Sequence, residues 1–440
     1  MARVVVVGGG YGGLASAARL AKLGHDVTLV EASDTLGGAL TSISRHGYTW
    51  DAGPDALLVP AVVRDLFRKS GRPLGSELGL EGDDGLVPLE VVREHRFADT
   101  SVLRLPGGSR RAQAESFDEL EPGLGAAWDS YVSDFDEVWE LLRRHYFEEP
   151  WQRDAMPRDV ARLLGSRDVL HKHLRRSFRD DRPALVAGHT FVADGHDLRN
   201  VPVWAGVVTY LEQLFGAWTL PGGLHRLRDL LAERLETRGV SVLLSTPAAD
   251  LVVEQGRVVA VRTLHGDELA ADVVVCAVDP RRLPALAPYV RRSMPAIPQV
   301  VAHIGLTGDV PDLTHEVVVH GDPLIIVKPG GQAPEGGTAW TLHGRGKLAE
   351  DILQALARSG IDVRDQVVTR IDRSPLELVT AWGGSPHGVL WQGRSTARER
   401  LGPTTPIAGV YAAGAHATPG SGLAYVGLGA ALVASAVGPA

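Results

Sequence analysis

The chain has 440 residues, of which 44% are hydrophobic and 22% are charged, and its formal net charge is −8. This length exceeds the usual size of one domain, so we expect two domains, and the acidic balance argues against nucleic acid as a partner. The single cysteine, Cys276, excludes an internal disulfide and a cysteine-based metal site, so we expect no metal and a reducing, cytoplasmic compartment.

The chain begins with a pattern of strand, turn, helix and strand. Residues 4–7 read VVVV, which is typical of a strand buried on both faces. Apolar spacing from Leu14 to Leu23 predicts a helix that ends near Gly24, and DVTLVE at 26–31 predicts a second strand. A tight turn therefore joins the first strand to the helix.

This turn matches the dinucleotide-binding fingerprint, Gly8-x-Gly10-x-x-Gly13. Gly8 permits the tight turn, Gly10 lets the backbone approach a pyrophosphate, and Gly13 lets the helix pack closely on the strand. Glu31 ends the second strand, where a carboxylate accepts hydrogen bonds from an adenosine ribose. The sequence therefore predicts a dinucleotide site here.

Further elements follow along the chain. Residues 115–215 are mostly helical and charged in pattern, and strand signals return at 240–245, 251–278 and 299–306. Gln255-Gly256 lies between alternating branched residues and predicts a hairpin turn. Residues 409–432 repeat the order of strand, glycine turn and helix. The uncharged run 423–440 reaches the lower length limit of a membrane span but is rich in glycine and alanine, so we expect a helix packed on the nucleotide domain.

Six motifs follow one another along the chain: the opening glycine turn with its LGG, then WDAGPDALLVP, GAWTLPGG, ADVVVCAVDPRRL, GGSPHGVLWQG and the final GVYAAGAHATPGSGLAYVGLGAAL. In this order they resemble the motifs of the FAD-dependent bacterial-type phytoene desaturases and their relatives among the amine-oxidase-like flavoproteins. The resemblance covers nearly the whole chain. It implies an α/β fold: a Rossmann-like FAD-binding domain, with a parallel sheet and a β-hairpin assembled from discontinuous segments, and an inserted mixed α+β substrate domain.

The resemblance also implies domain boundaries and cofactor contacts. The FAD-binding domain would comprise residues 1–70, 216–285 and 395–440, and the substrate domain, with its helical insert, residues 71–215 and 286–394. The implied FAD-binding residues are Gly8, Gly10, Tyr11, Gly12, Gly13, Glu31, Ala32, Gly37, Gly38, Gly53, Pro54, Ala248, Gly414, Ala415, Gly422 and Leu423. No cysteine lies near the final motif, so we expect non-covalent FAD.

The function implied is dehydrogenation of a largely apolar small molecule, isoprenoid-like or a secondary metabolite, by hydride transfer to the flavin. His416 is the candidate proton acceptor, with a structurally bonded histidine as the alternative, and Trp218, Trp382, Thr418 and Gly420 are candidates for the substrate pocket. The electron acceptor, oxygen or a quinone, stays open, as does a peripheral contact with a membrane. Ala39, where the family often has arginine, and the short chain argue against a long C40 polyene.

Three other functions stay open on the same scaffold. Many amine oxidases similar to this group have a lysine near the flavin, on a strand corresponding to residues 299–306. The five lysines of this chain lie at 22, 69, 172, 328 and 347, outside that strand, which disfavours an amine or amino-acid oxidase. A double-bond isomerase and a non-catalytic prenyl-binding relative are less favoured, the latter because both glycine turns and Glu31 are present.

Overall fold

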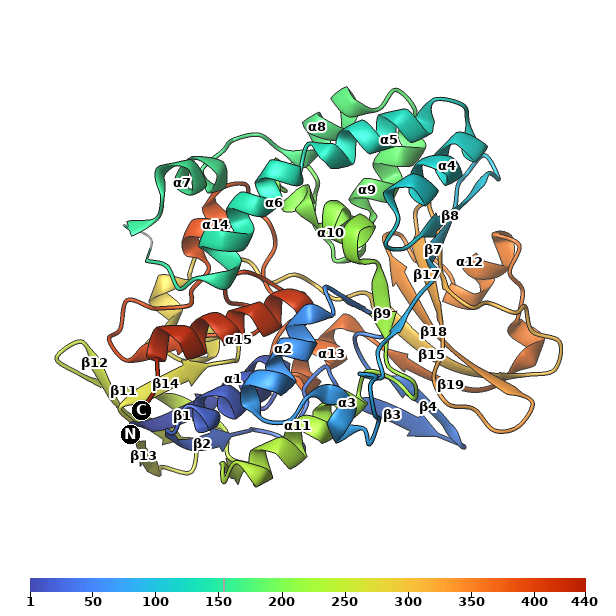
Figure 1. Cartoon of the computed structure of the whole chain (residues 1–440). Coiled ribbons are helices and arrows are strands. Elements are labelled where there is room, and N and C mark those ends of the chain that lie inside the picture. Colours follow the sequence, from blue (N-terminus) through green and yellow to red (C-terminus); the bar gives the residue numbers. More distant parts are fainter. Residues whose placement is uncertain (153–154) are drawn as a thin grey trace.

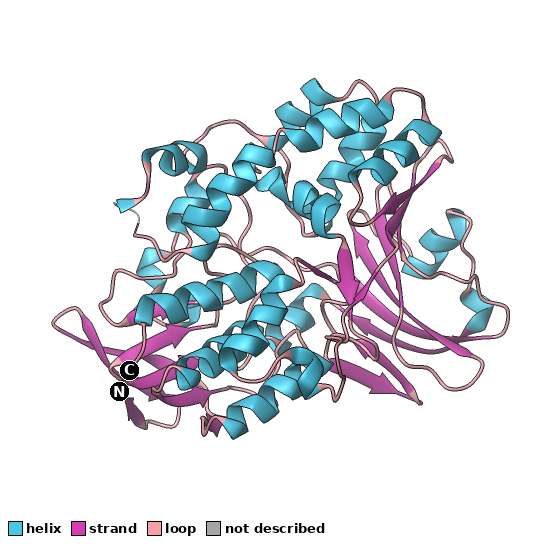
Figure 2. Ribbon diagram, in the orientation of Figure 1, coloured by secondary structure: helices cyan, strands magenta, loops and turns pink. Residues whose placement is uncertain are grey.

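The computed structural model describes residues 1–152 and 155–440. Its main elements are two large sheets with helices packed on them and a separate layer of helices (Figure 1; Figure 2). The first sheet has five parallel strands in the order β10-β2-β1-β14-β20. Their bounds are Ser241–Leu243, Asp26–Val30, Arg3–Val7, Val273–Cys276 and Val410–Ala412. The sheet joins distant segments of the chain, which confirms the predicted fold class, whereas the residue boundaries of the two domains stay a prediction.

Strand β1 is buried on both faces, as its valines predict. Val4 and Val6 pack in one hydrophobic cluster with Leu14 of α1 (Tyr11–Lys22), and Val5 and Val7 pack in a second cluster on the other face. Because side chains alternate along a strand, a run of branched residues serves both clusters at once.

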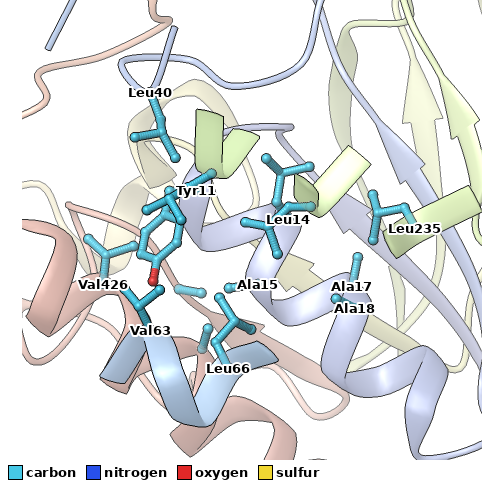
Figure 3. Close-up of a cluster of buried hydrophobic side chains, with 14 of the residues drawn as sticks. Tyr11, Leu14, Ala15, Ala17, Ala18, Leu40, Val63, Leu66, Leu235 and Val426 are labelled. Carbon is cyan, nitrogen blue, oxygen red and sulfur yellow. The ribbon is translucent and has the colours of Figure 1, made fainter. Parts of the chain in front are cut away.

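Helices α1, α11 (Arg226–Thr237) and α15 (Leu423–Val437) pack on one face of this sheet, and α2 (Ala61–Ser70) packs on α1 and α15. The alanines of α1 allow close packing against α2, α11 and α15, as Figure 3 shows for Ala15, Ala17 and Ala18. Residues 423–437 therefore form a helix packed on the first sheet, called the nucleotide sheet below, as predicted. Within the described parts of the chain, every helix is too short or too polar to cross a membrane.

The predicted hairpin forms part of a separate three-stranded sheet. Its strands are β11 (Ala248–Glu254), β12 (Arg257–Thr263) and β13 (Glu268–Ala270). Gln255 and Gly256 have φ angles of 49° and 78°, the positive values that a two-residue turn of this kind requires. The prediction of a hairpin at this dipeptide is confirmed.

The second large sheet has seven strands in the order β19-β15-β18-β17-β16-β7-β8. Their bounds are Val367–Arg373, Val300–Thr307, Gly337–Arg345, Leu324–Pro329, Glu316–Val319, Val91–Arg96 and Val102–Pro106. One face packs on α12 (Ile352–Arg358) through a cluster that includes Ile304, Val327 and Trp340. The strand predicted at 299–306 is β15, and the other face of the sheet borders the cavity described below.

The segment predicted as helical forms a layer of its own, which extends at the top of Figure 1 from the second sheet to the region above α15. It starts earlier than predicted, at Arg110, and packs around Trp128, Tyr131 and Phe135. Its elements are α4 (Arg110–Leu120), α5 (Leu124–Ser133), α6 (Asp136–Leu142), η1 (Arg143–Glu148), α7 (Arg158–Leu164), α8 (Leu170–Ser177), α9 (Asp181–Ala193), η3 (Val203–Gly206) and α10 (Val207–Phe215).

Short elements connect these layers. They are β3 (Ser42–Arg45), β4 (Tyr48–Asp51), β5 (Leu57–Leu58), α3 (Leu74–Glu77), β6 (Val87–Pro88), β9 (Ala217–Thr219), η4 (Pro280–Arg282), η5 (Ala287–Tyr289), η6 (Arg364–Gln366), α13 (Pro375–Ala381) and α14 (Ser395–Glu399).

Candidate functional site

A cavity of about 1020 Å³ is lined by all three main parts of the fold. Gly10 and Ala248 line it from the nucleotide sheet and its hairpin, Thr341 from the second sheet, and Leu211 from the helical layer. It includes these residues predicted from the sequence: Gly8, Gly10, Tyr11, Gly12, Glu31, Ala32, Gly37, Gly38, Gly53, Pro54, Ala248, Trp382, Gly414, Ala415, His416, Gly420, Gly422 and Leu423. One continuous cavity therefore brings most of the predicted site together.

The first glycine turn combines tight packing with open space. Gly8 has a φ of 103°, and a Cβ placed on Gly13 would lie 1.8 Å from the Gly8 carbonyl oxygen, so α1 packs directly on the turn. A Cβ on Gly10 would meet no protein atom within 4 Å. Protein packing therefore requires a glycine at position 13, whereas at position 10 a missing side chain leaves room for a ligand.

Glu31 lies beside this turn, and the backbone holds its carboxylate. Its Oε2 accepts a hydrogen bond from the Gly9 N–H at 2.6 Å, and its Oε1 accepts one from the Ser33 N–H at 2.8 Å. Glu31, Ala32 and Ala248 line the same end of the sheet and the cavity. The carboxylate is oriented at the position where the fingerprint places the ribose.

The second glycine turn touches the first. A Cβ on Gly12 would lie 2.7 Å from Gly414 Cα and 2.8 Å from Gly414 N. Gly414 has a φ of 88°, and Gly422, with a φ of 90°, is the N-cap of α15. The N-terminus of α15 therefore borders the cavity with its unpaired N–H groups and partial positive charge.

Two loops complete this half of the cavity. The Gly37 N–H donates to the Gly9 carbonyl at 2.8 Å, and a Cβ on Gly38 would lie 3.3 Å from Gly10 Cα. A Cβ on Gly53 would lie 2.5 Å from the Ala39 carbonyl oxygen, which brings Gly53 and Pro54 against the loop that holds Gly37. These residues fit a dinucleotide, because backbone N–H groups, open space and an oriented carboxylate lie along one continuous wall.

His416 lines the cavity and is 7% exposed. Its Nε2 lies 3.6 Å from Asp279 Oδ2, and within residues 1–152 and 155–440 it has no hydrogen-bond partner. Burial lowers the pKa of His416 to about 4, although Asp279 raises it. The ring is therefore neutral at pH 7, and its Nε2 is a buried nitrogen without a hydrogen-bond partner among the described residues.

The structure corrects the placement of Trp218 and Thr418, which do not line the cavity. Ala217 and Thr219 do, and because side chains alternate along β9, Trp218 points the other way and packs under Arg64. Thr418 is 1% exposed, and its N–H donates to the Leu401 carbonyl at 2.7 Å. Trp382 and Gly420, by contrast, line the cavity, and their part in substrate binding stays a prediction.

The sequence analysis missed a charged cluster on the second sheet. Arg93 Nε lies 3.1 Å from Glu316 Oε1 and Arg93 Nη1 lies 2.7 Å from Glu212 Oε2, while Lys328 Nζ lies 2.5 Å from Asp55 Oδ1. All five side chains border the cavity. Burial alone would lower the pKa of Lys328, but the carboxylates of Asp55 and Glu316 raise this pKa by more. The net shift is upward, so the amine is charged. Alternation in VVREHR, residues 91–96, was the one available signal, since it puts Arg93 and His95 on the same face.

Lys328 of β17 lies in the same cross-strand row as His303 of β15, the strand that lacks a lysine. It pairs with Thr341 of β18, and Thr341 pairs with His303 of β15. A lysine therefore borders the cavity from β17, which is two strands away from β15, the strand on which similar amine oxidases have a lysine.

Comparison with known proteins agrees with this geometry. The family model of flavin containing amine oxidoreductases matches residues 11–308. The chain is 24% identical to the 4,4'-diapolycopene oxygenase of Methylomonas sp over 98% of this chain and 97% of the relative. It is 28% identical to the hydroxyneurosporene desaturase of Cereibacter sphaeroides, over 99% and 97% of the two chains.

The fold matches that of a solved oxidase. Cyclohexylamine oxidase from Brevibacterium oxydans superposes with a TM-score of 0.66 at 18% identity, over 99% of this chain and 98% of the other. The match extends over the nucleotide sheet, the second sheet and the helical layer alike. The family model shows that the chain belongs to the flavin-containing amine oxidoreductase family, and the superposition shows that the whole chain has the fold of this oxidase.

Proposed function

We propose that the protein is an FAD-dependent desaturase that removes two hydrogen atoms from a largely apolar small molecule. The observation that carries this proposal is the single cavity, which joins a dinucleotide-type turn to a chamber walled by Phe147, Trp204, Val208 and Leu211. The relatives named above include a hydroxyneurosporene desaturase, which supports the same reaction class.

In this proposal the first half of the cavity holds FAD. Gly8, Gly10 and Gly13 form the pyrophosphate turn, Glu31 binds the ribose, and the segment 414–422 lies along the flavin ring. A bound FAD supplies a two-electron acceptor, which is the chemistry that a desaturation needs. The positive end of α15 stabilises negative charge at this position, and the apolar walls exclude water from it.

His416 accepts the second proton in this proposal. His416 lines the cavity within the segment 414–422, and its buried Nε2 has no hydrogen-bond partner among the described residues. The neutral ring is in the state that can accept a proton, and Asp279, 3.6 Å away, stabilises the charged form once it appears. We propose oxygen or a quinone as the final electron acceptor, and a reducing, cytoplasmic compartment on the basis of the single cysteine.

FAD is bound without a covalent thiol link in this proposal. Cys276 is the chain's one cysteine, it is fully buried in β14, and burial raises the pKa of its thiol to about 12. A thiol of this kind is inert.

Oxidation of an amine is the second candidate, and Lys328 is the observation that favours it. This charged lysine borders the cavity and lies in one cross-strand row with His303 of β15. Strand β15 corresponds to the strand on which similar amine oxidases have their lysine.

The test begins with the cofactor released from purified protein by acid, which should be FAD by chromatography and mass. The protein is then mixed without oxygen with isoprenoids and with primary amines, and flavin absorbance and products are recorded. Desaturation predicts flavin bleaching by an isoprenoid and a product two mass units lighter. Ammonia release with an amine would instead establish the second candidate, a product of unchanged mass would indicate an isomerase, and colourless protein would exclude a flavin enzyme.

A further inference from the structure

Arg400 is a buried cation without a carboxylate partner among the described residues. Arg19, Arg234 and Arg400 are the buried arginines among the described residues, at 7%, 4% and 4% exposure. Arg19 Nη2 lies 2.9 Å from Asp65 Oδ2, and Arg234 forms an ion pair with Glu77. For Arg400, no acidic side chain in the described parts of the chain lies within ion-pair distance.

The groups around Arg400 neutralise its charge incompletely. Nη1 donates to the Pro419 carbonyl at 2.7 Å, and Cζ lies 4.9 Å from the centre of the Trp391 ring. Nε is buried and has no hydrogen-bond partner within the described residues. Burial lowers the pKa of Arg400, yet a guanidinium keeps its proton at physiological pH. A buried charge of this kind is costly unless a partner supplies the opposite charge.

The cavity is the place from which that partner can come. Arg400 borders it, next to Pro419, Gly420 and Trp391, which border it as well. The guanidinium is a fork of donors that matches the two oxygens of a carboxylate. The chain therefore presents an anion-binding group at the cavity wall.

The charged cluster on the second sheet, unlike Arg400, consists of groups that are already in ion pairs. Its carboxylates Asp55, Glu212 and Glu316 are each paired with Lys328 or Arg93. A cationic ligand there would have to compete with those ion pairs, whereas an anion at Arg400 would compete with no ion pair in the part of the chain that the structure describes. This contrast favours an anionic group on the ligand over a cationic one.

Aromatic side chains extend from Arg400 along the helical wall of the cavity. The rings of Trp204 and Trp391 are 5.3 Å apart between centroids, and those of Phe147 and Tyr425 are 5.5 Å apart. All four residues border the cavity. An apolar body beside the anionic group would therefore find a surface on which to pack.

We propose that the substrate is an apolar molecule that ends in a carboxylate, with Arg400 as the residue that binds this group. The inference rests on the proposed function for the identity of the reaction, but the carboxylate site itself rests on the buried guanidinium and its surroundings. It differs from the sequence expectation, which described the substrate as largely apolar without a charged group.

Binding to the purified holoprotein tests the proposal without turnover. The probes are three C10 isoprenoids that share one chain, namely geranic acid, geraniol and geranylamine, measured by calorimetry in the absence of oxygen. The acid is expected to bind tighter than the alcohol and the amine by about tenfold or more, and Arg400→Gln to weaken binding of the acid by about 30-fold while changing the alcohol by less than about threefold. The matched control is Arg292→Gln, because the Arg292 side chain is 74% exposed.

Further outcomes distinguish a carboxylate site from a guanidinium that acts on the flavin or only on folding. Equal binding of the three probes by the wild type, or an Arg400→Gln protein that keeps its preference for the acid, overturns the proposal, and the wild-type comparison holds even if the variant does not fold. A lower flavin midpoint potential in Arg400→Gln with unchanged acid preference would assign Arg400 to the anionic flavin ring instead and likewise overturn it. Selective binding of the acid without flavin bleaching by any substrate would leave the carboxylate site standing and contradict the proposed desaturation.

Discussion

Gly10 and Gly13 belong to one motif, yet the structure gives them different physical requirements. Gly13 lacks space for a Cβ because the Gly8 carbonyl occupies it, whereas Gly10 has open space on its Cβ side. Residues of this motif could be predicted from sequence, because their spacing specifies the backbone. The placement of Trp218 could not, because it depends on which of two alternating faces of β9 is turned to the cavity.

Gly10→Val should give a folded protein that binds no FAD. The valine would meet no protein atom at Cβ, so stability is preserved, but its methyl groups would fill the place where the pyrophosphate must approach. Flavin absorbance of the purified variant measures the bound FAD, and urea unfolding checks that the variant is folded. Gly321→Val is the matched control, because Gly321 has neither a positive φ nor a place in the cavity, and a fully yellow Gly10→Val protein would contradict the assignment of this turn.

His416→Asn should slow flavin reduction by substrate without loss of FAD. Asparagine has no basic nitrogen, so the second proton loses its acceptor and the rate should fall by about 10²-fold or more. Stopped-flow reduction without oxygen, recorded from pH 6 to pH 9, measures this. His265→Asn, at an exposed position on the loop after β12, serves as the control, and an unchanged reduction rate in His416→Asn would show that another group takes the proton.

At the scale of elements, the sequence analysis predicted some of the strands with an apolar run and missed β7, β16 and β17 of the second sheet. Strands β1 and β15 read VVVV and VVAHIGL, and both were predicted. Strand β7 reads VVREHR, with Arg93 on the cavity face, so its pattern resembles that of a polar loop. The charged cluster was missed because Arg93, Glu316 and Lys328 come together only when β7, β16 and β17 pair in the folded sheet.

Gly13→Ala tests the packing of α1 on β1. Its Cβ would lie 1.8 Å from the Gly8 carbonyl oxygen, so helix and turn must separate, which costs about 1–3 kcal/mol of unfolding free energy. Urea unfolding of the cofactor-free protein measures the change. Gly10→Ala is the control, since it adds the same methyl group to open space, and equal stability of the two variants would contradict the contact.

At the scale of the whole molecule, buried neutral histidines make stability depend on pH. Burial lowers the pKa values of His196, His303, His320 and His416 to about 4 from the ordinary 6.5. The unfolded chain therefore binds more protons than the native one between pH 4 and pH 6.5. The stability due to these histidines is complete above pH 6.5 and is lost as the pH falls below it.

Lowering the pH from 7 to 5 should therefore cost about 2 kcal/mol of unfolding free energy for each such histidine. Thermal unfolding at constant ionic strength should show a Tm about 5–10 °C lower at pH 5 than at pH 7. In His303→Asn the difference should shrink, because one of the buried bases is gone. A Tm that stays constant over this range would contradict the burial of these rings in the native state.

The central claim is that substrate oxidation and flavin reduction occur in the cavity that is lined by the first sheet, the second sheet and the helical layer. Single-turnover stoichiometry tests it most directly: holoprotein and one equivalent of the substrate are mixed without oxygen, flavin absorbance is followed, and the product is quantified by mass spectrometry. The account predicts one flavin reduced for each product molecule that is two mass units lighter, and neither change in the flavin-free Gly10→Val protein. A lighter product without flavin bleaching, or bleaching without a lighter product, would contradict it.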